Sequence, residues 1–140
     1  MEVLFDGNGG HAFTFVVKIA KLALARRKIW AVVDTEGIFS PQSAEALGLD
    51  LKHLILLRPS VDDDAWAFTQ LLQSTDMGVC FWITRQMDNM VFRRLQLAAE
   101  RGGGLGFVFR PVSAEHKPCW ADLRLKTLCF PSDSKPYVRV

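Results

Sequence analysis

The chain has 140 residues, of which 49% are hydrophobic and 23% are charged, and its 17 basic and 15 acidic side chains leave a net charge of +2. This length suits one domain with one core. So small a net charge gives no argument by itself for a nucleic-acid partner. No apolar run approaches the roughly 20 residues that a membrane helix needs, so we expect no membrane partner.

The first element combines a short apolar run, a glycine-rich turn and an amphipathic segment, EVLFDGNGGHAFTFVVKI. This is the layout of a strand, a phosphate-cradling loop and a helix. In a P-loop, G-x-x-x-x-G-K-[ST], backbone amides wrap the phosphates, the lysine reaches the terminal ones and the hydroxyl binds magnesium. Here Gly7 stands at the first glycine and Thr14 at the hydroxyl, with Gly10 between them. An alanine replaces the second glycine, and Phe13 replaces the lysine.

Apolar runs and helical patterns then alternate along the chain. We expect strands at 3–5, 29–33, 53–57, 78–83 and 105–109, and helices at 12–27, 41–47, 60–74 and 88–101. In the helix at 60–74, Trp66 and Leu71 are expected on the buried side, together with Phe68 or Leu72. Such alternation favours right-handed crossovers and an α/β fold, with a mainly parallel sheet covered by helices on both faces.

The pattern changes towards the C-terminus. The stretch 120–130 is partly alternating and predicts one added strand, antiparallel or at the sheet edge. Residues 131–140 are expected to form a tail or a short docked strand. We therefore divide the chain into a core domain at 1–130 and a C-terminal segment at 131–140.

The cysteines and histidines offer no catalytic or metal-binding pattern. Cys80, Cys119 and Cys129 are odd in number and lack metal-ligand spacing, and the three histidines are scattered. Cys80 lies in an apolar run and is expected in the core. We expect reduced thiols in a cytoplasmic protein and no metal site.

Several motifs together resemble a known family. The P-loop remnant, then WAVVDTEGIFSP and ALGLDLKHLILLRP, resembles the core of RecA-type recombinases. The stretch FRRLQLAAERGGGLGFVFRP is closer still to the ImuA family, RecA-like accessory proteins of bacterial SOS mutagenesis and translesion DNA synthesis. The resemblance spans most of the chain, from about Glu2 to Leu125. It implies a RecA-like P-loop core and a protein partner, either a translesion polymerase-like protein or RecA.

The chain departs from that family where the chemistry would occur. In RecA-type ATPases the second core strand ends in D-x-E, whose glutamate activates the attacking water, and Asp34 and Glu36 match this pair. Phosphoryl transfer also depends on lysine and magnesium to offset developing charge. Phe13 supplies no charge, the strand that should end in a magnesium-directing aspartate reads FWIT, and Arg110 stands where the family has a phosphate-sensing glutamine.

We therefore predict a pseudo-ATPase with no catalytic residues, in which ATP and magnesium binding are absent or weak. Glu36 is expected to be structural and paired with Arg110. The degenerate nucleotide site would comprise Gly7, Gly10, Phe13, Thr14, Asp34, Glu36 and Arg110.

Two alternatives stay open. A weak nucleotide-binding or single-strand-DNA-binding domain would use arginines near the carboxyl ends of the strands, namely Arg85, Arg93, Arg94, Arg101 and Arg110, of which Arg85, Arg93 and Arg94 are the candidate phosphate or DNA contacts. Arg93 and Arg94 diverge on a helix, so a single patch would not use both. The other alternative is an ATPase with an unorthodox lysine, such as Lys18.

Overall fold

The computed structural model describes residues 1–7, 10–128 and 137–139. Helices and strands alternate as the sequence predicts. In chain order they are β1 (Glu2–Phe5), α1 (Gly10–Leu24), β2 (Ile29–Asp34), α2 (Pro41–Ala46), the short 3-10 helix η1 (Leu51–His53), β3 (Leu54–Leu57), α3 (Asp64–Gln73), β4 (Met77–Ile83), α4 (Asn89–Gly102), β5 (Leu105–Pro111), the 3-10 helix η2 (Val112–Ala114), β6 (Arg124–Leu128) and β7 (Tyr137–Arg139).

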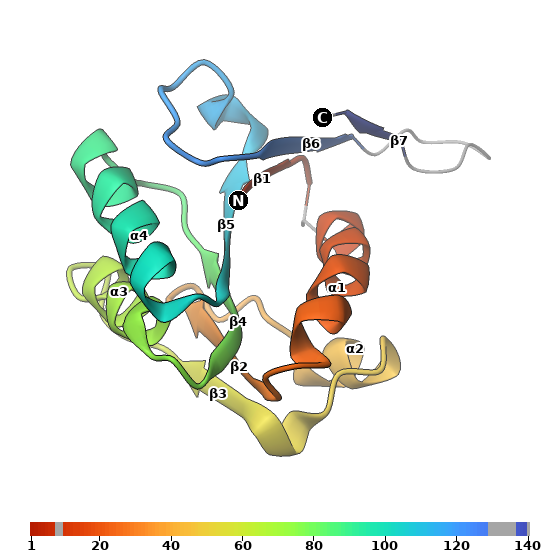
Figure 1. Cartoon of the computed structure of the whole chain (residues 1–140). Coiled ribbons are helices and arrows are strands. Elements are labelled where there is room, and N and C mark those ends of the chain that lie inside the picture. The colour runs from red at the N-terminus through yellow and green to blue at the C-terminus, as the bar shows by residue number, and fades with distance from the viewer. Residues whose placement is uncertain (8–9, 129–136, 140) are drawn as a thin grey trace.

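Within the described ranges the strands form one sheet in the order β3-β2-β4-β5-β1-β6-β7. Strands β1 to β6 all run parallel, and β7 pairs antiparallel with β6. Helices α1 and α2 cover one face, and α3 and α4 cover the other (Figure 1). The predicted α/β class, with a mainly parallel sheet between two helical layers, is confirmed.

The C-terminal strands differ from the prediction in one respect. The stretch 120–130 supplies β6, which is parallel to β1 and lies one strand inside the edge. Residues 112–123 carry the chain from the end of β5 to the start of β6, and such a crossover connects parallel strands. The antiparallel edge position belongs instead to β7, at 137–139.

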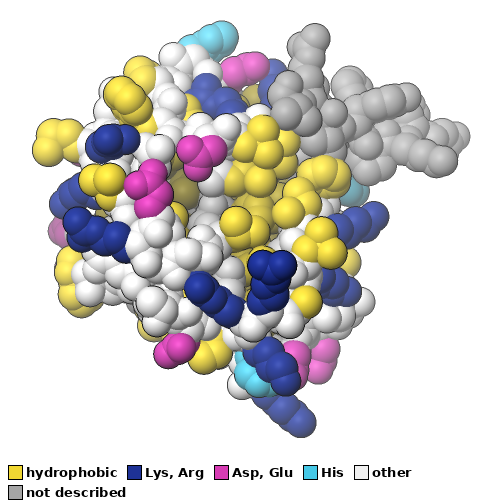
Figure 2. All heavy atoms as spheres, viewed as in Figure 1, with side chains coloured by type: hydrophobic (Ala, Val, Ile, Leu, Met, Phe, Trp, Pro, Cys, Tyr) yellow, Lys and Arg dark blue, Asp and Glu magenta, His cyan; other side chains and the backbone are white. Residues whose placement is uncertain are grey.

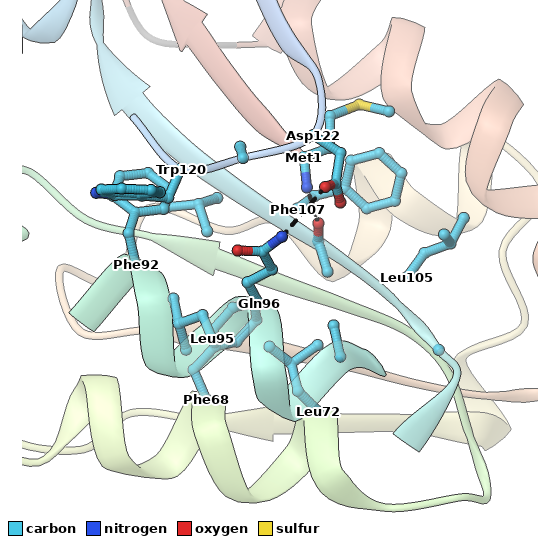
Figure 3. A pocket seen from close by; sticks show the side chains of 15 residues that line it. Met1, Phe68, Leu72, Phe92, Leu95, Gln96, Leu105, Phe107, Trp120 and Asp122 are labelled. Atoms are coloured by element: carbon cyan, nitrogen blue, oxygen red, sulfur yellow. Dashed lines mark hydrogen bonds between the residues drawn. The ribbon is translucent and has the colours of Figure 1, made fainter. Parts of the chain in front are cut away.

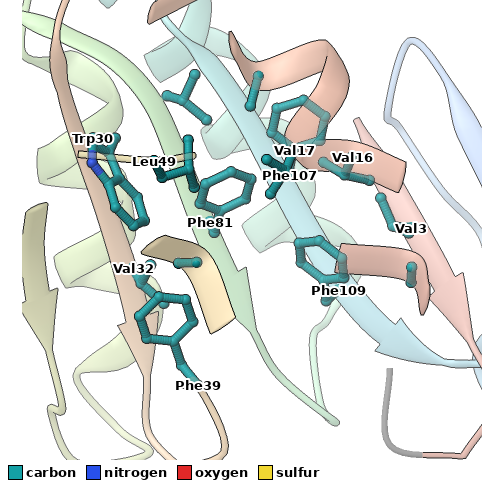
Figure 4. Packing of buried hydrophobic residues seen from close by; sticks show 14 residues of the cluster. Val3, Val16, Val17, Trp30, Val32, Phe39, Leu49, Phe81, Phe107 and Phe109 are labelled. Atoms are coloured by element: carbon teal, nitrogen blue, oxygen red, sulfur yellow. The ribbon is translucent and has the colours of Figure 1, made fainter. Parts of the chain in front are cut away.

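The core consists of one hydrophobic cluster on each face of the sheet. On the α1 face, Phe81 lies among Trp30, Phe107 and Phe109, and all four side chains are buried (Figure 4). On the α4 face, buried residues of α3 and α4 pack on the opposite sides of the same strands. Cys80 belongs to this second cluster and is buried, so it is a core residue as predicted, and this burial raises the pKa of its thiol to about 12.

The buried side of α3 is the predicted one in part. Trp66 is 66% exposed and Leu71 is half-buried, whereas Phe68 and Leu72 are buried. The buried stripe recurs at three- and four-residue intervals from Asp64, and Trp66 lies off it. Among the described helices, none is long and apolar enough to cross a membrane.

Candidate functional site

The carboxyl ends of β1, β2, β4 and β5 border a cleft of about 770 Å³ on the α1 side of the sheet. In open α/β sheets this edge is the usual place for ligands. The first turn of α1 forms one wall, and the loop after β2 together with α2 forms another. The lining residues are Phe5, Gly7, Gly10, His11, Phe13, Thr14, Glu36, Ile38, Phe39, Ser40, Ser43, Leu47, Ile83, Thr84, Arg85, Phe109 and Pro111.

The floor of the cleft is aromatic. The ring centroid of Phe13 lies 5.6 Å from that of Phe39, 5.4 Å from that of Phe81 and 6.1 Å from that of Phe109. The edge-on arrangements with Phe39 and Phe81 are favourable aromatic contacts. At the position where a P-loop carries lysine, this chain therefore places a ring that packs on the core.

The loop before α1 keeps some of the expected geometry. Gly7 has a φ of +61°, in the left-handed region that favours glycine. The Thr14 hydroxyl, which would bind magnesium in a P-loop, donates a hydrogen bond to the Gly10 carbonyl at 3.0 Å within its own helix. The Thr14 hydroxyl is thus bonded to the backbone of its own helix at the edge of the cleft.

Asp34 organises the loop after β2. Its side chain is fully buried, and its two carboxylate oxygens accept hydrogen bonds from the backbone N–H groups of Ile38 and Phe39, each at 3.0 Å. The Arg58 Nε lies 3.6 Å from the same carboxylate. These bonds fold the loop so that Phe39 reaches the aromatic floor.

Glu36 is held by an arginine, but by a different one from that predicted. Both of its carboxylate oxygens accept from the Nε of Arg85, at 2.8 and 2.9 Å. This pair joins the loop after β2 to the loop after β4 at the rim of the cleft. The predicted pairing of Glu36 with Arg110 is wrong, because successive side chains of β5 point to opposite faces. Phe109 faces the cleft, and Arg110 faces α4, where its guanidinium lies 5.7 Å from the Phe92 ring centroid.

Arg110 instead belongs to a buried charge network on the α4 face. Glu2 is fully buried and accepts from the Nη1 of Arg110 at 2.8 Å and from the Nε of Arg124. Arg124 also donates to the carbonyls of Glu115 and Lys117, at 2.8 and 2.9 Å. Sequence analysis missed this network, although charged residues inside apolar strand patterns signal that a buried partner is needed.

A second buried carboxylate, Asp64, lies on the α4 face in the first turn of α3. Its Oδ2 accepts from the Trp82 indole at 3.3 Å and from the Thr35 hydroxyl at 3.4 Å. Desolvation raises the pKa of this carboxyl, and the hydrogen bonds from the Ala65 backbone, Trp82 and Thr35 oppose that rise. The Asp62–Asp64 run thus contributes one buried acceptor to the core.

The structure does not bring the three predicted phosphate-contacting arginines together. Arg85 lines the cleft, whereas Arg93 and Arg94 lie exposed on α4, on the other face of the sheet. Arg93 donates to the Gln96 side chain at 2.8 Å. On the face seen in Figure 2, Lys and Arg side chains are dispersed and interspersed with acidic ones.

A smaller cavity of about 130 Å³ lies between α4, the start of β5 and residues 120–122 (Figure 3). Its lining is mostly apolar, and Gln96 donates to Asp122 at 3.5 Å across its wall. Ligand pockets usually measure about 300–1,000 Å³, so the cleft is the better candidate site.

The comparisons with known proteins establish the fold and no family. Scans against protein-family models and curated proteins find no match. Among solved structures, SulA from Pseudomonas aeruginosa superposes with a TM-score of 0.65 at 14% identity, over 79% of this chain and 96% of that chain. At this identity the likeness supports a shared α/β fold alone. The RecA-like and ImuA-like assignments stay predictions.

Proposed function

We propose that this protein is a non-catalytic interaction module in the bacterial DNA-damage response, built on a RecA-like core whose nucleotide site is degenerate. One observation carries the non-catalytic part of the proposal. Phe13, at the P-loop lysine position, packs among Phe39, Phe81 and Phe109. The damage-response part rests on the sequence resemblance to ImuA.

The charges around the cleft support the loss of nucleotide chemistry. A triphosphate needs cations and magnesium to offset its charge. Among the described lining residues, Arg85 is the one Lys or Arg side chain, and its Nε is held by Glu36. At the end of β4, where a magnesium-directing carboxylate would stand, the Thr84 hydroxyl donates to the Gln86 carbonyl at 2.9 Å.

Calorimetry with ATP and magnesium tests this part of the proposal. Loss of one charge-assisted contact costs about 1.5–3 kcal/mol, which lowers affinity by about one to two decades. We therefore expect no micromolar binding and no phosphate release. Phe13→Lys alone should not restore turnover, with Phe13→Leu as the matched apolar control. Micromolar binding, or phosphate release that Glu36→Gln abolishes, would contradict the proposal.

The partner part needs its own experiment. The protein is immobilised and titrated with purified RecA and with a translesion polymerase-like protein, and saturable binding to either supports the proposal. Binding to neither, together with sub-micromolar binding of single-stranded DNA at physiological salt, would favour the nucleic-acid alternative. Non-specific DNA contacts alone typically give dissociation constants of roughly 1–100 μM.

A further inference from the structure

The cleft at the carboxyl edge of the sheet combines an aromatic floor with a rim that carries the Glu36–Arg85 ion pair. We propose that it binds a short acidic-hydrophobic segment of a partner protein, in which a large apolar side chain follows an aspartate or glutamate. This inference rests on the proposed role as an interaction module and assigns the binding surface for it.

The floor would receive the apolar side chain. The half-buried ring of Phe13 and the edges of the buried rings of Phe39 (7% exposed) and Phe109 (3% exposed) line a cleft of about 770 Å³, within the usual range for ligand sites. Ile38 stands at the rim with 51% of its surface exposed, although a hydrogen bond from its backbone N–H to Asp34 fixes its loop. An apolar side chain held in solvent beside a hollow gains contact when a partner covers it.

The rim sets the sign of charge that the partner should carry. The Arg85 side chain is 75% exposed, and its hydrogen bonds to described residues all use Nε. The two terminal guanidinium nitrogens can therefore donate to a further carboxylate. Helix α1 begins at the same rim and has no acidic residue in its first turn, so its positive end adds to the preference for an anion.

Glu36 is the one Asp or Glu among the described lining residues, and Arg85 neutralises it. One carboxylate can accept from the two terminal nitrogens of Arg85, whereas a triphosphate would bring several negative charges to a rim whose one guanidinium is already balanced by Glu36. The geometry points to one carboxylate at Arg85 and one or two apolar side chains on the phenylalanine floor.

The probe is a capped synthetic peptide in which aspartate precedes phenylalanine and leucine, with serine elsewhere. One control peptide has lysine for the aspartate, and another has alanine for both apolar residues. Titration into the ¹⁵N-labelled protein should shift backbone amide signals around the cleft, including those of Ile38, Ser43 and Thr84. The lysine and alanine peptides should bind at least about fivefold more weakly.

Two protein variants localise the binding. Ile38→Glu and Arg85→Glu should each weaken the aspartate peptide by about tenfold, and Arg85→Glu should reverse the preference towards the lysine peptide. Leu22→Glu on α1 and Arg94→Glu on α4 are matched controls, because both residues are exposed and lie outside the lining of the cleft. Neither control should change the affinity.

The inference is overturned if millimolar aspartate peptide shifts no cleft amide, if the lysine peptide binds equally well, or if the control variants weaken binding as much as the cleft variants. A parallel titration with ATP and magnesium distinguishes a failure of the peptide-binding inference from a failure of the proposed non-catalytic function. Micromolar ATP binding in the cleft would overturn both. Absence of binding by both ATP and peptide would remove only the cleft assignment.

Discussion

On the α1 face of the sheet the carboxyl ends of the strands meet aromatic rings, a cleft and one buried carboxylate, Asp34, whereas on the α4 face the same strands bury an ion-paired network. Adjacent residues of β5 make the contrast plain. Phe109 lies on the cleft floor, and Arg110 is 1% exposed on the other side, bonded to Glu2. Strand alternation thus places an aromatic side chain and a buried charge on opposite faces of the sheet within a single residue step.

The difference between the two faces indicates a different role for each, strand arrangement on the α4 face and binding on the α1 face. On the α4 face, Glu2 of β1 binds an arginine from each neighbouring strand, Arg110 of β5 and Arg124 of β6. Burial of charges gains little net stability, but an unpaired buried charge is costly, so such a network favours one strand arrangement over others. On the α1 face the half-buried ring of Phe13 and the exposed side chain of Ile38 border the cleft, and a partner could cover both.

The largest expected effect comes from Glu2→Gln. This change leaves Arg110 buried without its anion, so the free energy of unfolding should fall by about 3–5 kcal/mol. Urea denaturation measures the loss. Glu100→Gln, at an exposed position of α4, is the control and should stay within about 0.5 kcal/mol of the parent.

A double variant sharpens this test. Glu2→Gln combined with Arg110→Met removes both charges of the buried pair and should recover part of the lost stability. A loss below about 1 kcal/mol in the single variant would mean that the network contributes no more than an exposed pair.

A smaller effect is expected at Asp64, the other buried carboxylate of the α4 face. Desolvation raises its pKa above the ordinary value of 3.8, so the folded protein holds this proton more tightly than the unfolded chain does. The free energy of unfolding should therefore fall as pH rises from about 3.8 through the raised folded pKa. Asp64→Asn should remove this fall. At pH 7 its stability should lie within about 1 kcal/mol of the parent, since the amide oxygen keeps an acceptor for Trp82.

Unfolding followed from pH 4 to pH 7 checks the Asp64 prediction. Asp76→Asn, at an exposed turn after α3, is the matched control and should keep the parent's slope. If the free energy of unfolding of Asp64→Asn changes with pH as steeply as that of the parent, other carboxyl groups cause the pH dependence.

Much of the fold could be predicted because buried parallel strands read as continuous apolar runs. The run at 29–33 matches β2 (Ile29–Asp34), and the run at 78–83 matches β4 (Met77–Ile83). Strand direction could not be read in this way, because a side-chain period of two is the same for parallel and antiparallel strands. The stretch 120–130 therefore predicts a strand but neither its parallel direction nor its place one strand inside the edge.

The candidate site was predictable in part for a similar reason. Carboxyl ends of parallel strands share one edge, and so Gly7, Phe13 and Glu36 lie around one cleft. The pairing of Glu36 with Arg85 depends on the loops, whose paths the sequence did not specify. The position of Arg110 was accessible, because a strand that places Phe109 in the cleft must turn the next residue away.

The smallest expected effect concerns the ion pair at the rim of the cleft. Glu36 and Arg85 form two short contacts, but the Arg85 side chain is 75% exposed, and exposed pairs typically contribute about 0.2–1 kcal/mol. Glu36→Gln and Arg85→Ala should each lower the free energy of unfolding by no more than this, and the loss should shrink at high salt.

A double-mutant cycle in urea isolates the pair's own contribution. Arg93→Ala, which removes an exposed arginine bonded to Gln96 on α4, is the matched control. A coupling energy above about 2 kcal/mol would mean that the Glu36–Arg85 pair stabilises the fold as strongly as the buried Glu2 network does. The proposed difference between the two faces of the sheet would then be wrong.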